Sequence, residues 1–261
     1  MNVKSNLEEK IKEIKKKKLI AFDVDGTIAK SRSKIDAEMA ELLKKLLITK
    51  KVAIITGGAF ADIEKQVLSE IGLNNELNNN LILLPTNGGS LQIFDGTWKE
   101  LSSSKFTPEE KKEIISAIKK VEDDNLEFYN EKVFGKKIQD RNSQITYSAL
   151  GDQAPTELKY AWDPDLKKKI KLQAELKKSL PNFEVNIGGK TSIDITIKGI
   201  DKAFAVQKAM NYLNLEKNDV LFIGDAVYEN GNDFPVTKIG IDTIKVTNHE
   251  DTKKVIGMLI T

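Results

Sequence analysis

Short, almost uninterrupted apolar runs alternate with helical patterns in the first and last thirds of this 261-residue chain. Four of these runs read as strands buried on both faces, at residues 18–22, 52–55, 81–84 and 220–223. Apolar residues at helical spacing predict helices over residues 35–48, 59–71 and 202–213, and a further strand and helix follow near the C-terminus. Buried strands that alternate with helices are typical of an α/β fold, with a parallel sheet covered by helices on both faces.

The middle of the chain has a different pattern, in which polar and apolar residues alternate along the predicted strands. Such alternation predicts an antiparallel sheet with one polar face and helices on the other. The predicted elements are a hairpin of Ser90 to Phe94 with an Asp95-Gly96 turn, a helix beginning at Thr107-Pro108, a helix over residues 165–180, and strands over residues 144–148 and 192–197.

These two patterns predict two domains. A discontinuous α/β core is expected from residues 1–88 and 198–261, and an inserted α+β domain from residues 89–197.

Composition excludes several classes of protein. The 41 basic residues nearly balance 39 acidic ones, which gives no general reason to expect nucleic acid or membrane partners. The absence of cysteine excludes disulfides and thiolate chemistry, and the single histidine, His249, is expected at the surface. No apolar run approaches the ~20 residues that span a bilayer, and the N-terminus lacks the apolar part of a secretory signal. A cytoplasmic location is therefore expected.

Much of the basic excess lies between Lys10 and Lys18, a stretch with six lysines in which Ile11 and Ile14 are three residues apart. We interpret it as a short amphipathic helix that leads into the first strand. Binding to RNA or to an anionic surface is the alternative interpretation.

Two carboxylates follow the first strand directly, in the sequence Asp23-Val24-Asp25-Gly26-Thr27. In an open parallel sheet, ligands bind beyond the carboxyl ends of the strands. Carboxylates two residues apart on a glycine-containing loop can face one small site, where they can bind magnesium and attack phosphorus. A solvated turn or a calcium loop is the alternative, and the buried strand immediately before Asp23 argues against it.

Three further groups follow the later strands. Thr56-Gly57-Gly58 offers a hydroxyl and backbone amides to a phosphate, although such turns are common. Lys202, at the start of a predicted helix, could neutralise a phosphoryl group, although a single lysine is usually a surface residue. Asp225 follows the strand at 220–223 and could complete a magnesium site, with Asp233 orienting it, although a second acidic turn is the alternative.

These four groups, in this order, resemble the signature motifs of the haloacid dehalogenase superfamily of phosphatases and phosphomutases. The resemblance covers essentially the whole chain and implies a Rossmann-like core with an inserted cap domain. It implies that Asp23 forms an aspartyl-phosphate, that Asp25 protonates the leaving oxygen and activates the second acceptor, and that the phosphoryl group is bound by Thr56, Gly57 and Lys202. It also implies a Mg²⁺ ion held by Asp23, the backbone carbonyl of Asp25 and Asp225, with Asp233 in support.

The insertion after the third strand is similar to the cap of subfamily IIB, and within it the chain is most similar to the eukaryotic-type phosphomannomutases. The similar segments are Phe22 to Thr27, Asn87-Gly88-Gly89, Arg141-Asn142, Ile187 to Asp194, Asp201-Lys202 and Gly231-Asn232-Asp233. In that family, residues matching Arg141, Ser192 and Asp194 bind substrate, and the caps often form a homodimer. Outward-facing positions on an alternating strand are the alternative interpretation of Ser192 and Asp194.

The cap also departs from that family. Asp152 stands near a position where the family carries arginine, and no arginine follows Arg141. Lys159 could supply charge but lacks the planar fork of a guanidinium. We therefore predict a phosphatase acting on a phosphorylated sugar or similar small metabolite, with a phosphomannomutase-like activity as the alternative. A non-catalytic binding module is a third possibility, against which the full set of acidic residues and Lys202 argue.

Overall fold

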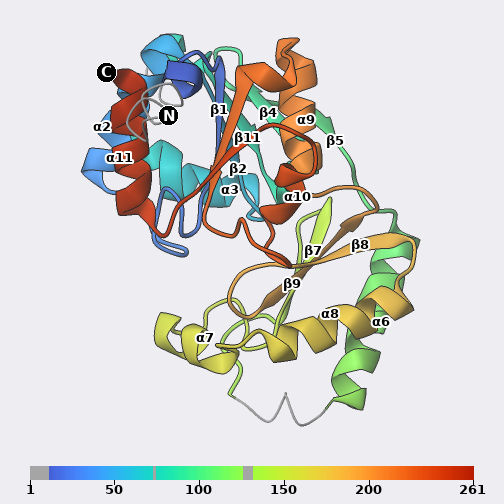
Figure 1. The fold of residues 1–261 in the computed structure, drawn as a ribbon. Helices are drawn as coiled ribbons and strands as arrows, with labels where there is room; N and C mark the ends of the chain where they lie inside the picture. Colours follow the sequence, from blue (N-terminus) through green and yellow to red (C-terminus); the bar gives the residue numbers. More distant parts are fainter. Residues whose placement is uncertain (1–11, 73–74, 126–131) are drawn as a thin grey trace, which may run out of the picture. The chain divides into compact units, whose positions relative to one another are not determined.

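The computed structural model describes residues 12–72, 75–125 and 132–261 (Figure 1). The chain forms two compact units, one made of Met1–Ser102 with Lys202–Thr261 and the other of Ser103–Asp201. We call them the core unit and the cap unit.

The core unit is built on a seven-stranded sheet with the order β11-β10-β1-β2-β3-β4-β5. The first five strands in this order are parallel, and β4 runs antiparallel to β3. The strands are β1 (Leu19–Asp23), β2 (Lys51–Ile55), β3 (Leu81–Leu84), β4 (Ser90–Phe94), β5 (Trp98–Ser103), β10 (Val220–Gly224) and β11 (Asp242–Lys245).

The central strands have continuous apolar sequences because both faces of the sheet are covered. In β1, Ile20 and Phe22 contribute to one hydrophobic cluster, and Leu19 and Ala21 contribute to another. Successive side chains of a strand point to opposite faces, so each strand must supply apolar residues to both clusters.

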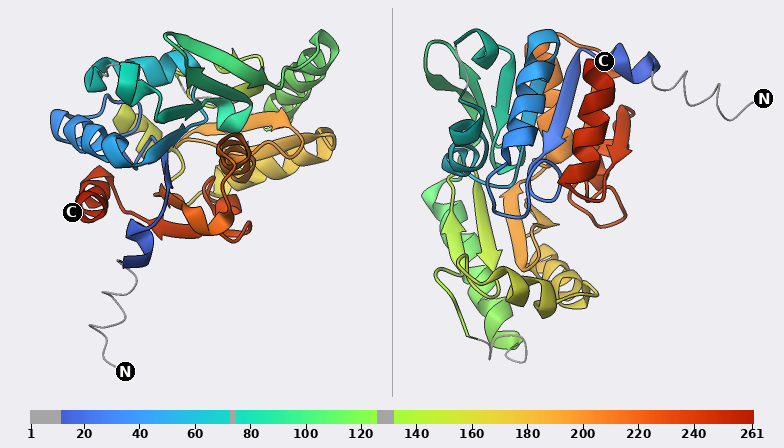
Figure 2. Two further views of the ribbon diagram at one scale, coloured as in Figure 1. Left: turned by 90° about the horizontal axis from the view of Figure 1, so that it is seen from above. Right: turned by 90° about the vertical axis from the view of Figure 1, so that its left-hand side faces the viewer.

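Helices cover both faces of this sheet, with α2 and α11 on one face and α9 and α10 on the other (Figure 1). The helices α2 and α11 lie side by side (Figure 2). The helical segments are α2 (Ala37–Thr49), α3 (Phe60–Ile63), the π-helix η1 (Glu64–Leu68), α4 (Ser69–Ile71), α5 (Asn75–Asn78), η2 (Thr86–Gly88), α9 (Lys202–Leu213), η4 (Lys217–Asp219), α10 (Phe234–Thr237) and α11 (His249–Ile260).

Two helix predictions need correction. The predicted single helix at residues 59–71 is three consecutive segments, α3, η1 and α4, the middle one a π-helix. In the lysine-rich segment only residues 12–15 are helical, Lys16 to Lys18 form the connection into β1, and residues 10 and 11 lie outside the described residues.

The cap unit contains a four-stranded antiparallel sheet with the order β6-β7-β9-β8. The apolar residues of its alternating strands pack with α6 and α8 in a separate hydrophobic cluster. The helix α6 begins with a capping box between Thr107 and Glu110. The elements are α6 (Pro108–Asp124), β6 (Ile138–Asp140), β7 (Gln144–Ser148), α7 (Thr156–Trp162), α8 (Lys167–Ser179), β8 (Phe183–Ile187) and β9 (Ser192–Ile197).

The boundary between the units differs from the predicted one. Residues 89–102 were expected in the inserted domain, but they form the hairpin β4–β5, and β4 pairs with β3 in the core sheet. The division falls between Ser102 and Ser103 because the backbone hydrogen bonds of β4 belong to the core. The predicted fold class, a parallel-sheet α/β core with an inserted α+β unit and its antiparallel sheet, is confirmed. Among the described residues, no helix is both long and apolar enough to cross a membrane.

Candidate active site

The predicted catalytic groups of the core unit gather at the carboxyl ends of three adjacent strands. Asp23 is the last residue of β1, which lies between β10 and β2. Asp225 directly follows β10, and Thr56 directly follows β2. From β1 the chain continues to β2 and β3 on one side, and it later returns to β10 and β11 on the other side. Open α/β sheets bind ligands at such a point, where the strand order reverses direction.

Lys202 joins two of the carboxylates. It is the first residue of α9, and its side chain is 1% exposed. Its Nζ lies 2.5 Å from Asp23 Oδ1 and 2.5 Å from Asp233 Oδ1. A buried ammonium requires this kind of pairing, because an unpaired charge in the interior carries a large desolvation cost.

Three carboxylates form one acidic group. Single oxygens of Asp23, Asp225 and Asp233 lie within 4.8 Å of one another. Asp225 approaches this closely because residue 26 is glycine, with φ +91°: a Cβ there would meet Asp225 Oδ2 at 2.5 Å. The sequence Asp-x-Asp-Gly thus serves the site through its glycine as well as its carboxylates.

The pKa of Asp23 is raised to about 8, with burial as the largest cause; Lys202 lowers this pKa, and the neighbouring carboxylates of Asp233 and Asp225 add to the rise. The carboxylates of Asp23 and Asp233 raise the pKa of Lys202 against the effect of burial, so this ammonium stays charged. Three carboxylates face one ammonium, and this excess of negative charge suits a hard divalent cation with oxygen ligands. The acidic group therefore could bind a metal ion.

Asp25 is held separately from the three-carboxylate group. Its Oδ1 accepts hydrogen bonds from the backbone N–H of Arg32 at 2.5 Å and from Gln66 Nε2 at 3.2 Å. Its carboxylate is half-buried, unlike that of Asp23. The two carboxylates of the Asp-x-Asp sequence are thus held by different partners, Lys202 for one and an amide pair for the other.

Thr56, Gly57 and Gly58 form a turn beyond β2. The hydroxyl oxygen of Thr56 accepts a hydrogen bond from the N–H of Gly58 at 3.0 Å, so its hydrogen remains available to donate. The register pairs Asp23 with Ile55, which places Thr56 beside the end of β1.

The Asn87-Gly88-Gly89 sequence positions α9. A Cβ at Gly88, where φ is +86°, would meet Ala205 Cα at 2.6 Å, so only glycine permits this approach of α9 to the end of β3. Lys208 Nζ, on α9, also donates to the carbonyl of Gly88 at 3.1 Å. These contacts fix the helix that carries Lys202.

In the cap unit, Ser192 and Asp194 lie on one face of β9. Ser192 Oγ accepts a hydrogen bond from Gly189 N at 2.7 Å, and Asp194 Oδ1 accepts one from Thr146 Oγ1 at 2.8 Å. Thr146 stands opposite Asp194 in the sheet, and Gln139 stands opposite Thr146. The polar positions of the alternating strands therefore form one row across the sheet.

Arg141 and Asp152 share one partner in this unit. Arg141 Nη2 donates to Gln139 Oε1 at 2.9 Å, and Gln139 Nε2 donates to Asp152 Oδ2 at 3.0 Å. Asp152 Oδ1 also accepts from the N–H of Lys136 at 2.8 Å. The carboxylate of Asp152 is therefore linked to Arg141 through one amide side chain.

Sequence reasoning missed Gln66 and Gln139, the two amides that hold Asp25 and Arg141. Gln66 lies in the π-helix η1, and π-helical turns are frequent at functional sites, but the sequence carries no signal for one. Gln139 could have been found only from the register of β6 and β7.

A family model described as haloacid dehalogenase-like hydrolase matches residues 20–235. The chain belongs to the haloacid dehalogenase-like hydrolases. The predicted resemblance is thereby confirmed, and the chain is an enzyme of this hydrolase and phosphotransferase class.

Curated relatives of this chain include phosphomannomutases. The phosphomannomutase of Spinacia oleracea is 27% identical over 245 residues, covering 89% of this chain and 92% of the relative. That of Schizosaccharomyces pombe is 29% identical over 247 residues, covering 90% and 91%. Among solved structures, Plasmodium falciparum IMP-nucleotidase superposes with a TM-score of 0.70 at 18% identity, covering 94% of this chain and 68% of that one, which shows a shared fold.

Proposed function

We propose that this haloacid dehalogenase-like hydrolase is a Mg²⁺-dependent phosphatase that hydrolyses a phosphorylated sugar or a similar small metabolite. The observation that carries the proposal is the setting of Asp23, a buried carboxylate at a strand end, paired with Lys202 and beside Asp225 and Asp233. A nucleophile needs a fixed position and a nearby cation to attack an anionic phosphate.

In the first half of the proposed reaction, an oxygen of Asp23 attacks the phosphorus atom, and the bond from phosphorus to the leaving oxygen breaks. Asp25 donates a proton to that oxygen. Because Arg32 and Gln66 both donate to Oδ1 of Asp25, Oδ2 is the oxygen we assign to the proton. Lys202 and Thr56 hold the phosphoryl oxygens.

In the second half, the ionised Asp25 takes a proton from a water molecule as the water oxygen attacks the phosphorus. The bond from phosphorus to Asp23 breaks, inorganic phosphate leaves, and both aspartates return to their starting states. One side chain thus acts first as an acid and then as a base.

The Mg²⁺ ion would be held by Asp23, Asp225 and the backbone carbonyl of Asp25. Both oxygens of Asp233 have partners already, Oδ1 with Lys202 and Oδ2 with the N–H of Ala226 at 2.9 Å. Asp233 therefore suits a supporting role, in which it orients Lys202. When bound, the ion would neutralise charge on the phosphoryl group.

The cap unit supports hydrolysis over mutase chemistry. A mutase must hold a second phosphate while the substrate reorients, and Asp152 places a negative charge in the group that contains Arg141. The alternative, a phosphomannomutase-like activity, is supported by the names of the curated relatives and by the likeness of Ser192 and Asp194 to sugar-binding positions.

The nucleophile assignment is tested with p-nitrophenyl phosphate and Asp23→Asn. Loss of turnover by at least about 10³-fold is expected, because an amide is not a nucleophile of this kind. Asp95→Asn, an exposed aspartate paired with Lys99 in the core unit, is the control and should keep wild-type turnover. Equal activity of Asp23→Asn and wild type would refute the assignment.

The acceptor is tested with hexose 1-phosphates, with and without the matching bisphosphate. Release of inorganic phosphate that the bisphosphate does not stimulate is the expected result. Bisphosphate-stimulated formation of hexose 6-phosphate without free phosphate would establish the mutase alternative instead.

A further inference from the structure

Thr252 connects the C-terminal helix to the loop that carries the nucleophile. It is the fourth residue of α11, and both it and Thr27 are fully buried. Thr252 Oγ1 donates to the carbonyl oxygen of Thr27 at 2.6 Å. Thr27 Oγ1 in turn lies 3.3 Å from Asp23 Oδ2, to which it donates. Two hydroxyl groups thus link α11 to the carboxylate of Asp23.

The loop between Asp23 and Lys30 uses most of its backbone groups internally. The carbonyl oxygen of Val24 accepts hydrogen bonds from the N–H groups of Thr27, Ile28 and Ala29. The N–H of Gly26 donates to the carbonyl of Ala29. The carbonyl of Thr27 instead accepts the hydrogen bond from α11. Without the hydroxyl of Thr252 this buried carbonyl would lose that donor, and a shift of the loop would be favoured.

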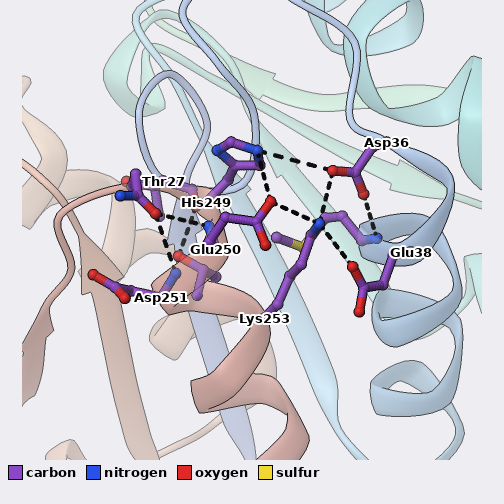
Figure 3. Close-up of polar contacts among 10 residues, drawn as sticks. Thr27, Asp36, Glu38, His249, Glu250, Asp251 and Lys253 are labelled. Carbon is purple, nitrogen blue, oxygen red and sulfur yellow. Dashed lines mark hydrogen bonds and ion pairs between the residues drawn. The ribbon is translucent and has the colours of Figure 1, made fainter.

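Ion pairs fix the first turn of α11 against the start of α2. Lys253 Nζ lies 2.8 Å from Asp36 Oδ2, 2.9 Å from Glu38 Oε2 and 3.0 Å from Glu250 Oε1 (Figure 3). Asp36 is also the N-cap of α2, where its Oδ1 accepts from the N–H of Met39. These contacts fix the position of the first turn of α11, and so the position of Thr252, relative to the loop that contains Thr27.

His249 belongs to the same group of side chains. Its Nε2 lies 3.1 Å from Glu250 Oε1 and 3.9 Å from Asp36 Oδ2, and its side chain is only 14% exposed. The sequence suggested an ordinary surface position for this residue. Figure 3 shows it at the first turn of α11, with its ring toward Glu250 and Asp36. The ammonium of Lys253 lies among three carboxylates, so these ion pairs hold the first turn of α11 in place.

We propose that Thr252 is a positioning residue for the reaction, which acts through Thr27 on the orientation of Asp23. The inference rests on the proposed role of Asp23 as nucleophile. Thr252 lies outside the four groups of residues from which the active site was predicted. Its effect falls on the orientation of the Asp23 carboxylate through Oδ2, and a nucleophile needs a position accurate to a fraction of an ångström.

The test replaces Thr252 by valine, which has the same shape without the hydroxyl. With p-nitrophenyl phosphate, we expect kcat to fall roughly tenfold while KM changes less than about twofold, because misplacement of the nucleophile affects attack more than binding. Thr252→Ser keeps the hydroxyl and should restore most of kcat. Ile256→Val is the matched control: it lies one turn further along the buried face of α11, and it loosens packing without removing a hydrogen bond.

The outcomes separate this inference from the proposed function. If Asp23→Asn is inactive while Thr252→Val keeps the kcat of Ile256→Val, the inference about Thr252 is wrong and the nucleophile stands. If Asp23→Asn is fully active, both fail. If Thr252→Val does not fold, Thr252→Ala is measured in its place, and wild-type kcat without the hydroxyl would overturn the inference. A fall in kcat that serine does not restore would also overturn it.

Discussion

The candidate active site of the core unit and the polar face of the cap sheet hold their side chains in different ways. In the candidate active site, Asp23, Thr56 and Asp225 each stand at the carboxyl end of a buried strand, and Lys202 begins a helix. On the cap sheet, Gln139, Thr146 and Asp194 come from three neighbouring strands and contact side chains near them. In the core unit, the ends of the strands and of the helix fix where the side chains lie. On the cap sheet, the contacts depend on the register between the strands and on which side chains stand at the paired positions.

This difference bears on function. Changes in the core should alter the chemistry for every substrate, because the proposed nucleophile, Asp23, is held there. Changes on the cap sheet should alter only which substrates are used. The predictions below separate these effects.

The largest loss of stability is expected for Lys202→Met. The variant leaves Asp23 and Asp233 as buried carboxylates without their ammonium, which should cost about 3–5 kcal/mol of stability and at least about 10²-fold in turnover. Gln207→Met, at an exposed position on the same helix, is the control and should keep near-wild-type turnover. Both are measured by urea unfolding and with p-nitrophenyl phosphate.

A double variant shows whether the loss of turnover in Lys202→Met comes only from unfolding. Asp233→Asn combined with Lys202→Met removes one of the unpaired charges and should recover part of the lost stability without activity. Recovery of turnover in the double variant would contradict the role given to Lys202.

A smaller effect, confined to the cap, is expected for Asp152→Asn. Removal of this charge should lower KM for a sugar bisphosphate by roughly fivefold, since one partly screened charge contributes about 1 kcal/mol. Turnover of p-nitrophenyl phosphate should not change. Asp163→Asn is the control, because the carboxylate of Asp163 accepts hydrogen bonds from the N–H groups of Lys168 and Lys169 at the start of α8. An altered kcat for p-nitrophenyl phosphate would show that the two regions are not separable in this way.

The pKa of Asp23 predicts how metal binding depends on pH. Its value is about 8 in the folded protein against an ordinary 3.8, with burial the largest cause. The folded state therefore binds more protons than the unfolded state between these values, so Asp23 makes the metal-free protein less stable as pH rises from about 4 to 8. A cation competes with this proton, and Mg²⁺ should raise Tm more at pH 8.5 than at pH 6.

Calorimetry or a thermal shift assay checks this prediction. In Asp23→Asn the dependence of the Mg²⁺ effect on pH should largely disappear. An equal rise in Tm at both pH values in the wild type would contradict it.

The smallest effect is expected for Lys253→Met. Burial would raise the pKa of Asp36, but the hydrogen bond from Lys253 lowers it overall, as expected for a real ion pair. Because the three carboxylates are 44–69% exposed, solvent screens the group and the cost should be roughly 1 kcal/mol. Lys254→Met, which breaks an exposed pair with Asp251, should cost less than Lys253→Met. Equal losses of stability for Lys253→Met and Lys254→Met, measured by urea unfolding, would show that Lys253 does not hold α11 in place.

The same contrast explains what the sequence could predict. Asp23, Thr56, Lys202 and Asp225 were predictable because each is tied to a strand or helix end that the apolar pattern reveals. The partners of Arg141 were not predictable, because the amide of Gln139 reaches Asp152 only in one register of β6. The unit boundary was misplaced for a related reason: nothing in the sequence of Ser90 to Phe94 says which sheet its backbone joins.

The central claim is that Asp23 takes the phosphoryl group and passes it to water. The most direct measurement is rapid quenching of the enzyme during turnover, followed by mass spectrometry of the peptide that contains Asp23. We predict one added phosphoryl group on Asp23, which decays with release of inorganic phosphate at the rate of turnover. In Asp25→Asn we expect hydrolysis of the phosphorylated Asp23 to be slowed, so the added group should be easier to detect. If the enzyme turns over but Asp23 carries no phosphoryl group in either the wild type or Asp25→Asn, Asp23 is not the nucleophile.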